Sequence, residues 1–142
     1  MPTTIEHLDH TADLGLRVAA ETVEEAFCEA ARGLFGLMLD LRTVRPRAEY
    51  AVHLVAASNA DLLVEWLSDL LAQKELTGQV FSEFKVEIGR TEGRHVLDGV
   101  ALGERFDPER HRPRIEVKGI TYLGLEVRRR DTAWTAQFVV DV

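Results

Sequence analysis

Two segments of the chain place apolar residues at the three- and four-residue spacing of an α-helix. One begins after Thr22 and the other after Ser58, and the hydroxyl groups of such residues cap helix N-termini. Glu25 follows Thr22 by three residues and completes a capping box. Each helix has one apolar stripe that must be buried against another layer. The stripes are Val23, Ala26, Phe27, Ala30, Ala31, Leu34, Phe35 and Met38, and Leu62, Leu63, Trp66, Leu67, Leu70 and Leu71.

The other layer is predicted to be a β-sheet, because most of the remaining chain alternates apolar and polar residues. Turn signals at Glu92-Gly93, Asp107-Pro108 and Arg130-Asp131 divide the second half of the chain. The predicted strands lie at 4–8 and 14–20, at 50–55 between the helices, and at 84–88, 115–118, 123–127 and 134–140 after them.

This order of elements predicts the fold class. Two strands, a helix, a strand and a second helix are followed by about five strands. We therefore expect an α+β fold, with two helices packed on one face of a mixed, largely antiparallel β-sheet. The chain has 142 residues, a common size for one domain, and no internal repeat or linker, so residues 1–142 are expected to form a single domain.

Composition and charge narrow the function. The single cysteine excludes an internal disulfide, and no signal peptide or apolar run long enough to span a membrane is visible, so we expect a cytoplasmic protein without a membrane partner. The formal net charge of −7 argues against direct, stable nucleic-acid binding, which depends on Lys and Arg neutralising phosphates. The one basic run, Arg128–Arg130, reads as a solvated hairpin turn. An acidic chain suits a protein partner or a cation better.

Four groups capable of metal binding or proton transfer lie close together near the N-terminus. They are His7, Asp9, His10 and Asp13, just before a predicted strand. Loops held by a sheet often carry functional groups. Local turn chemistry, in which the aspartates cap backbone amides and His10 binds a carbonyl, accounts for the same pattern, and the spacing alone favours it.

The other end of the chain supplies two more carboxyl groups. Asp141 and the terminal carboxylate of Val142 follow the last predicted strand. If that strand ends beside Asp13, three carboxyl groups converge and repel one another unless a cation neutralises them. Oxygen ligands of this kind suit Ca²⁺ or Mg²⁺, whereas zinc would require the histidines as well.

Lys118 is the remaining candidate. It follows the charged segment Gly103–His111, which reads as a hairpin, and it lies on the polar face of a predicted strand. A lysine there can pair with a carboxylate, a phosphate or an acidic group of a partner.

These patches, in this order, resemble the archease family over essentially the whole chain. The most specific segments are His10-Thr11-Ala12-Asp13-Leu14-Gly15 and Glu116-Val117-Lys118-Gly119-Ile120-Thr121-Tyr122. Further matches are Glu24–Phe27, Leu37–Asp40, Leu62–Leu67, Gly103-Glu104, Arg110-His111 and Asp141. One departure is Leu123, where the family usually has histidine.

The resemblance implies a site and a function. The implied metal ligands are Asp13, Asp141 and Val142, with Lys118 important for activity and His7, Asp9 and His10 left as supporting or turn residues. The implied cofactor is a divalent cation, Ca²⁺ first, with Mg²⁺ or Mn²⁺ as alternatives. Archeases are non-catalytic proteins that activate the RtcB-type RNA ligase of tRNA splicing: they promote its guanylylation and repeated turnover and broaden its nucleotide use.

Two other functions remain open from the sequence. The cluster from His7 to Asp13 would also suit a metal-dependent hydrolase, which needs an open metal position and a general base. A general chaperone-like modulator of nucleic-acid-processing proteins would instead present an exposed apolar patch.

Overall fold

The computed structural model describes residues 3–7 and 13–142. The elements, in chain order, are β1 (Thr3–His7), β2 (Asp13–Ala20), α1 (Val23–Met38), the 3-10 turn η1 (Leu41–Thr43), β3 (Ala48–Ala56), α2 (Asn59–Thr77), β4 (Gln79–Thr91), β5 (Arg94–Arg105), the short helix α3 (Pro108–His111), β6 (Gly119–Arg130) and β7 (Ala133–Asp141).

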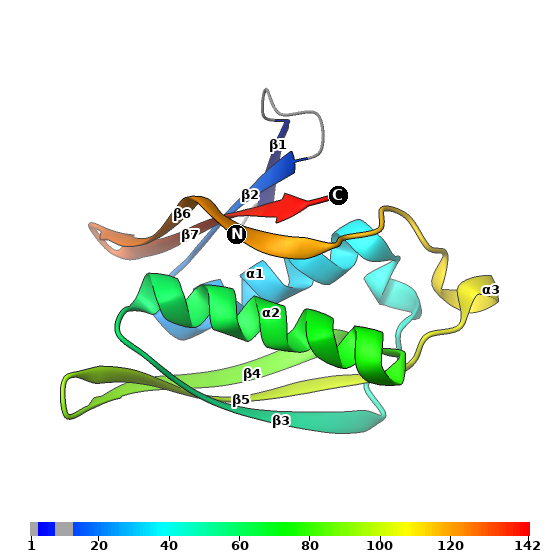
Figure 1. Ribbon diagram of the computed structural model, residues 1–142, viewed down its shortest axis with the longest axis horizontal. Helices are drawn as coiled ribbons and strands as arrows, with labels where there is room; N and C mark the ends of the chain where they lie inside the picture. Colours follow the sequence, from blue (N-terminus) through cyan, green and yellow to red (C-terminus); the bar gives the residue numbers. More distant parts are fainter. Residues whose placement is uncertain (1–2, 8–12) are drawn as a thin grey trace.

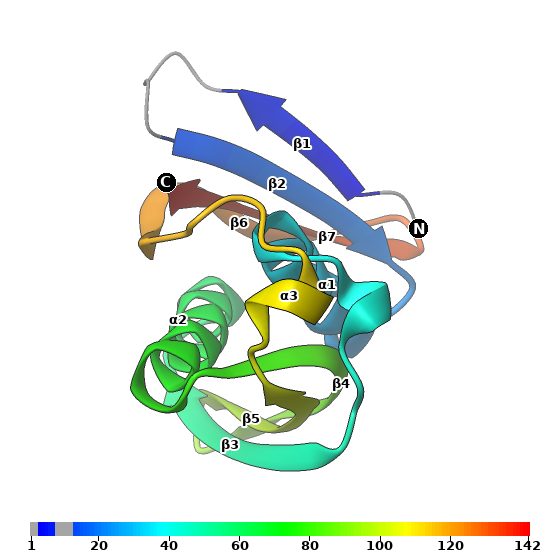
Figure 2. The same cartoon turned by 90° about the vertical axis from the view of Figure 1, so that its right-hand side faces the viewer.

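The described strands form two antiparallel sheets, and α1 and α2 lie between them (Figure 1). One sheet has the order β1-β2-β7-β6 and the other β3-β5-β4. Figure 2 shows the three layers along the helix axes. Helix α1 contacts β2, β7 and β4, while α2 contacts β6, β3, β4 and β5. The predicted α+β fold and its largely antiparallel character are confirmed. The expected single mixed sheet with both helices on one face is instead two antiparallel sheets, because each helix buries residues toward both sides.

Both long helices begin where the sequence predicts, and for the predicted reason. The Thr22 hydroxyl accepts a hydrogen bond from the Glu25 N–H at 3.1 Å, and the Ser58 hydroxyl accepts one from the Asp61 N–H at 3.1 Å. These bonds satisfy amide groups that have no partner within the first turn of a helix. Helix α2 ends at Gly78, whose φ of 76° is a left-handed conformation that glycine adopts without strain.

Trp66 ties the helical layer to the three-stranded sheet. Its fully buried indole donates a hydrogen bond to the Phe27 carbonyl of α1 at 3.1 Å and packs edge-on against Phe84 of β4. Gly99 of β5 leaves space for the ring, because a Cβ there would lie 2.9 Å from it. One tryptophan on α2 therefore contacts α1, β4 and β5 together.

The predicted strand at 115–118 is wrong. Residues 112–118 run as an irregular connection, and β6 begins only at Gly119. The connection is hydrogen-bonded to the end of α1. The Arg114 N–H donates to the Met38 carbonyl at 2.8 Å, and the Ile115 N–H donates to the Leu37 carbonyl at 3.0 Å. The last carbonyls of a helix have no partner within it. Capping α1 replaces a strand pairing here.

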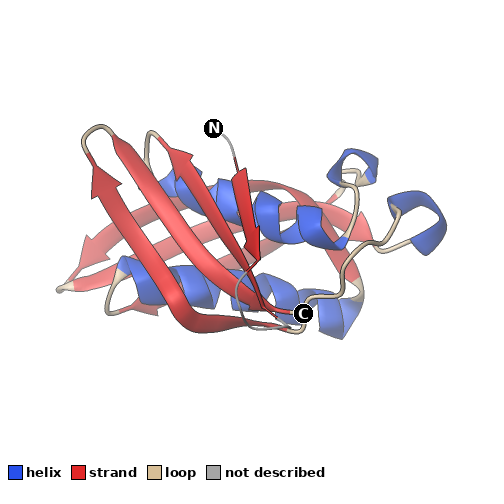
Figure 3. Ribbon diagram, turned by 90° about the horizontal axis from the view of Figure 1, so that it is seen from above, coloured by secondary structure: helices blue, strands red, loops and turns tan. Residues whose placement is uncertain are grey.

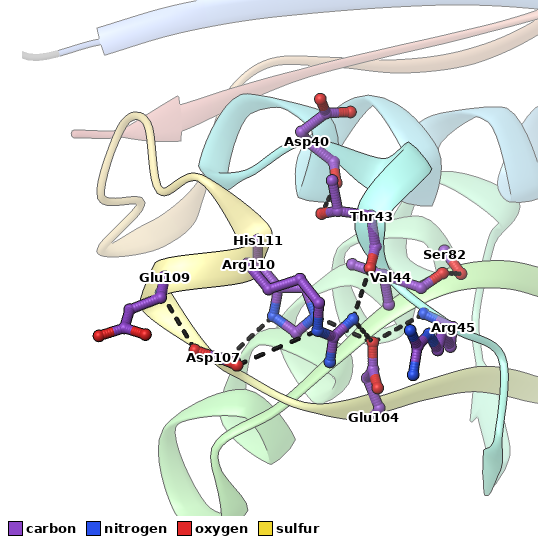
Figure 4. Close-up of polar contacts among 10 residues, drawn as sticks. All are labelled: Asp40, Thr43, Val44, Arg45, Ser82, Glu104, Asp107, Glu109, Arg110 and His111. Atoms are coloured by element: carbon purple, nitrogen blue, oxygen red, sulfur yellow. Dashed lines mark hydrogen bonds and ion pairs between the residues drawn. The ribbon is translucent and has the colours of Figure 1, made fainter.

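A partly buried ionic cluster holds the start of this connection (Figure 4). Oε2 of Glu104 accepts hydrogen bonds from the Arg45 N–H at 2.8 Å, from Nη1 of Arg110 at 2.7 Å and from Nε2 of His111 at 2.9 Å. Nη1 of Arg110 also donates to the Thr43 carbonyl at 2.8 Å. The cluster joins the end of β5, helix α3 and the segment that follows α1.

The histidine of this cluster is bonded at both ring nitrogens. His111 is fully buried, and its Nδ1 accepts a hydrogen bond from the Asp107 N–H at 2.9 Å, so the ring proton lies on Nε2 and points at Glu104. The Arg110 guanidinium, helped by the Arg45 amide and His111, holds the pKa of Glu104 well below its usual range. Glu104 is therefore ionised whenever the protein is folded at ordinary pH.

Replacing Glu104 by alanine should destabilise the fold. The change leaves buried His111 without an acceptor and Arg110 without its carboxylate, at a cost of about 2–4 kcal/mol in the free energy of unfolding at pH 7. A matched control is Glu126→Ala, which breaks the exposed Glu126–Arg128 pair and should cost less than about 1 kcal/mol. Urea unfolding followed by tryptophan fluorescence measures both, and equal losses would contradict this role for the cluster.

The same pair of variants gives an acid test. Because the pKa of Glu104 is lowered on folding, its contribution is present above the unfolded value of about 4.3 and is lost as the pH falls below it. We expect the free energy of unfolding to decline less from about pH 5 to about pH 3 in Glu104→Ala than in the unaltered protein. An unchanged slope in that variant would show that the carboxylate is not the acid-sensitive group.

A glycine in β5 should also be irreplaceable. A Cβ on Gly103 would lie 1.7 Å from the Val80 carbonyl oxygen, at the bulge where the β4–β5 register shifts between Phe81 and Glu83. Gly103→Ala should lower stability by about 3 kcal/mol or more, because the backbone must move. Gly89→Ala is the control, since a Cβ there has no neighbour within 4 Å. Similar melting temperatures for the two variants would refute the steric argument.

Candidate metal site at the end of the four-stranded sheet

The register of β2 and β7 brings two predicted ligands together. Asp13, the first residue of β2, is the direct partner of Asp141, the last residue of β7. Residues directly opposite in an antiparallel pair carry their side chains on the same face, with Cβ atoms about 4.5–5.5 Å apart. The next positions along these strands, Leu14 and Val140, are buried toward the helices. Asp13 and Asp141 therefore share the outer face of the sheet.

Strand β6 completes the same end of the sheet. Gly119 pairs with Asp141 from the other side, and the Lys118 N–H donates a hydrogen bond to the Asp141 carbonyl at 2.7 Å. Figure 1 shows β2, β6 and β7 meeting near the C-terminus, far from the hairpin that joins β6 to β7. Asp13, Asp141 and Lys118 thus come from three different segments and meet at one place.

Lys118 borders a groove on the helix side of this edge. The groove has a volume of about 220 Å³ and lies between α2 and the start of β6, where Glu75 and Ser68 of α2 also line it. Lys118 is exposed and precedes β6, so it lies just before a strand, whereas the sequence analysis placed it within one. It is held beside the carboxylates through its backbone.

Val142 and His7 also lie near this end of the sheet. Val142 follows Asp141, and its side chain is partly buried against the hydrophobic core. The backbone of His7 pairs with Leu14 at the end of β1, next to Asp13. Asp9 and His10 lie outside the described residues. The structure therefore groups Asp13, Asp141, Val142 and Lys118.

The donor set fits a hard cation. Among residues 13–142, no three His, Cys, Asp or Glu side chains form a group that could hold a metal ion. Asp13 and Asp141 would supply two carboxylates, so main-chain oxygens and water must complete any coordination shell. Ca²⁺ accepts such mixed oxygen shells, and Mg²⁺ commonly keeps several waters. Zinc prefers histidine and cysteine, which residues 13–142 do not bring to this place.

Sequence reasoning missed a polar cluster that precedes Lys118 in the chain. Glu104, Arg110 and His111 were interpreted as part of a charged hairpin, whereas they form one partly buried cluster. A partial signal was present, because Asp107-Pro108 is a typical helix start and Asp107 does cap α3. Its partners on other elements could not be read from spacing.

Comparisons with known proteins identify relatives along the whole chain. Residues 5–142 match the model of the Archease protein family. The protein archease of Pyrococcus furiosus is 40% identical over 138 residues, which cover 96% of this chain and 97% of that protein. The protein archease of Methanopyrus kandleri is 41% identical, with 96% of this chain and 98% of that protein covered. In the described part of the chain, no helix is both long and apolar enough to cross a membrane.

Solved structures agree with these relatives. The solution structure of protein 1598 from Methanobacterium thermoautotrophicum has a TM-score of 0.86 and 31% identity, covering 99% of this chain and 98% of that one. The crystal structure of an archease from Thermotoga maritima, described as a possible chaperone, shares the fold with a TM-score of 0.58 at 18% identity, covering 96% of each chain. With a family model that matches nearly every residue and several relatives near 40% identity, the chain belongs to the archease family.

Proposed function

We propose that this protein is a non-catalytic accessory factor that activates an RtcB-type RNA ligase of tRNA splicing in the cytoplasm. It would act through a divalent cation held by Asp13, Asp141 and the main-chain oxygens of Val142, with Ca²⁺ as the first candidate and Mg²⁺ or Mn²⁺ as alternatives. The supporting observation is the strand register that sets Asp13 opposite Asp141, with Lys118 bonded to the same residue.

The arrangement suits presentation to a partner better than catalysis alone. Asp13 and Asp141 are half-buried at the end of a sheet, on its outer face, and the groove beside Lys118, on the helix side, holds only about 220 Å³. Enzyme sites for small molecules are usually larger, enclosed pockets of about 300–1,000 Å³. A site open at an edge can instead be brought against another protein's active centre.

Each group has a distinct part in this proposal. The two carboxylates hold the cation, which when bound supplies positive charge for phosphate oxygens. Lys118 supplies a second positive charge that can reach a phosphate or an acidic side chain of the ligase. The net charge of −7 favours association with a basic, RNA-handling enzyme by charge complementarity.

The decisive experiment measures ligase guanylylation and multiple-turnover ligation with and without this protein. We expect Asp13→Asn, Asp141→Asn and Lys118→Ala each to reduce the stimulation at least about tenfold, as loss of one charged contact does. Asp98→Asn, an exposed aspartate on the other sheet, is the control and should stimulate normally. Full stimulation by all three site variants would show that the site assignment is wrong.

Cation binding is tested separately, by calorimetric titration with Ca²⁺. Asp13→Asn and Asp141→Asn should each weaken binding by at least about tenfold, whereas Lys118→Ala should not, because an ammonium group cannot ligate a cation. Equal affinity in all variants would remove the metal from the proposal. Turnover of phosphoester substrates by the protein alone, abolished by Asp13→Asn, would favour a hydrolase over an accessory factor.

A further inference from the structure

The edge strand β6 carries a bulge with two exposed apolar side chains. Strand β6 lies at the edge of the four-stranded sheet, on the side opposite β1, and Figure 3 looks onto this sheet. The register with β7 shifts between Thr121 and Glu126, where four residues of β6 stand opposite Phe138 alone. Tyr122 and Leu123 begin this bulge and are 68% and 51% exposed. Two adjacent large apolar side chains are therefore left in contact with solvent.

The bulge is ordered by hydrogen bonds. The Leu123 N–H donates to Oγ1 of Thr121 at 3.2 Å, and Nε2 of Gln137 donates to the Gly124 carbonyl at 2.8 Å. Gly124 has a φ of 68°, a left-handed conformation that glycine adopts without strain. The chain returns to the hydrophobic core at Leu125. Side chains on such an ordered segment lose less conformational entropy on binding than side chains on a flexible one.

Protection of the sheet edge accounts for a bulge but not for these two side chains. A bulge interrupts the row of free backbone groups on an edge strand and so hinders pairing with another chain. Charged residues or proline serve the same purpose, whereas this bulge presents a tyrosine and a leucine. Tyrosine is enriched among the residues that contribute most to binding between proteins. The bulge therefore suits insertion of Tyr122, with Leu123 beside it, into a pocket of a partner.

The bulge lies close to the candidate metal site. Tyr122 follows Lys118 by four residues, and four residues of chain span at most about 14 Å. The Lys118 N–H is itself bonded to the Asp141 carbonyl. A typical protein interface covers about 800 Å² of each partner, which is a patch roughly 30 Å across. A protein that docks on Lys118 and Asp141 through such an interface therefore covers the bulge as well.

We propose that Tyr122 and Leu123 anchor this protein to its RNA ligase partner, by inserting into an apolar pocket beside the ligase's active centre. This inference rests on the proposed function, which identifies the partner that faces Asp13, Asp141 and Lys118. The anchor and the site have different parts: the anchor determines how long the complex lasts, and the site determines what the complex does. A second copy of the chain seated on the bulge would cover the same site and exclude the ligase.

The test measures the dissociation constant and the dissociation rate of the complex between the full chain and the purified ligase, by biolayer interferometry. We expect Tyr122→Ala/Leu123→Ala to raise the dissociation constant at least about tenfold, mainly through faster dissociation, because an aromatic anchor is lost. Tyr122→Phe keeps the ring and should stay within about threefold of the unaltered chain. The melting temperature and the Ca²⁺ affinity of the double variant should not change, since both side chains are exposed.

The matched control is Val55→Ala, which shortens an exposed apolar side chain on β3 of the other sheet and should leave the affinity for the ligase unchanged. Unaltered ligase binding by the double variant, while Lys118→Ala still lowers the stimulation, would overturn the anchor and leave the proposed function standing. Absence of any ligase binding by the unaltered chain would overturn both. Sedimentation equilibrium covers the remaining occupant: a dimer that the double variant abolishes would assign the bulge to a second copy and overturn the anchor.

Discussion

The pairing of β7 with both β2 and β6 is the constraint on which this molecule depends. Strand β7 lies inside the four-stranded sheet, so its hydrogen bonds hold the N-terminal and C-terminal parts of the chain together. A register slip of one residue would turn every side chain of a strand to the opposite face. It would move Phe138 and Ala136 out of the core and Asp141 into it. The burial of the core therefore also determines where the carboxylates lie.

The helical layer gives the second constraint, because it is covered on both sides. Trp66 illustrates this: its hydrogen bond to Phe27 and its contact with Gly99 link two helices and a strand through one side chain. A helix buried on two sides needs a wide apolar surface, and α1 buries eight residues, Ala26, Phe27, Ala30, Ala31, Leu34, Phe35, Leu37 and Met38. Helices α1 and α2 thus lie between the two sheets and pack against both.

Local signals made much of the fold predictable. Thr22 and Ser58 indicate where the helices begin, because capping involves neighbouring residues only. The alternation of apolar and polar residues located most of the strands. The division into two sheets could not be predicted. Alternating apolar and polar residues indicate that one face of a strand is buried, but they do not identify the layer that covers it. Residues 112–118 were misassigned for a related reason, as Arg114 and Ile115 bond to carbonyls of α1 that are distant in sequence.

The candidate site was predictable in part. Asp13, Asp141 and Lys118 were selected by a family resemblance, and the register then brought them to one place. Spacing alone would have favoured turn chemistry for Asp13. The cluster around Glu104 escaped sequence reasoning, because its residues come from a strand, a short helix and a loop whose contacts no local pattern encodes.

The position of β7 also bears on how the protein reaches its folded state. Arg17 and Gln137 are hydrogen-bonded across 120 residues of sequence, so the four-stranded sheet closes a very long loop. Proteins dominated by such distant contacts fold slowly. On the ribosome, β2 emerges long before its partner exists, and the inner side of β2 stays open until β7 is made. We therefore expect a nascent chain to display Asp13 without Asp141, so that the two carboxylates face each other only in the completed sheet.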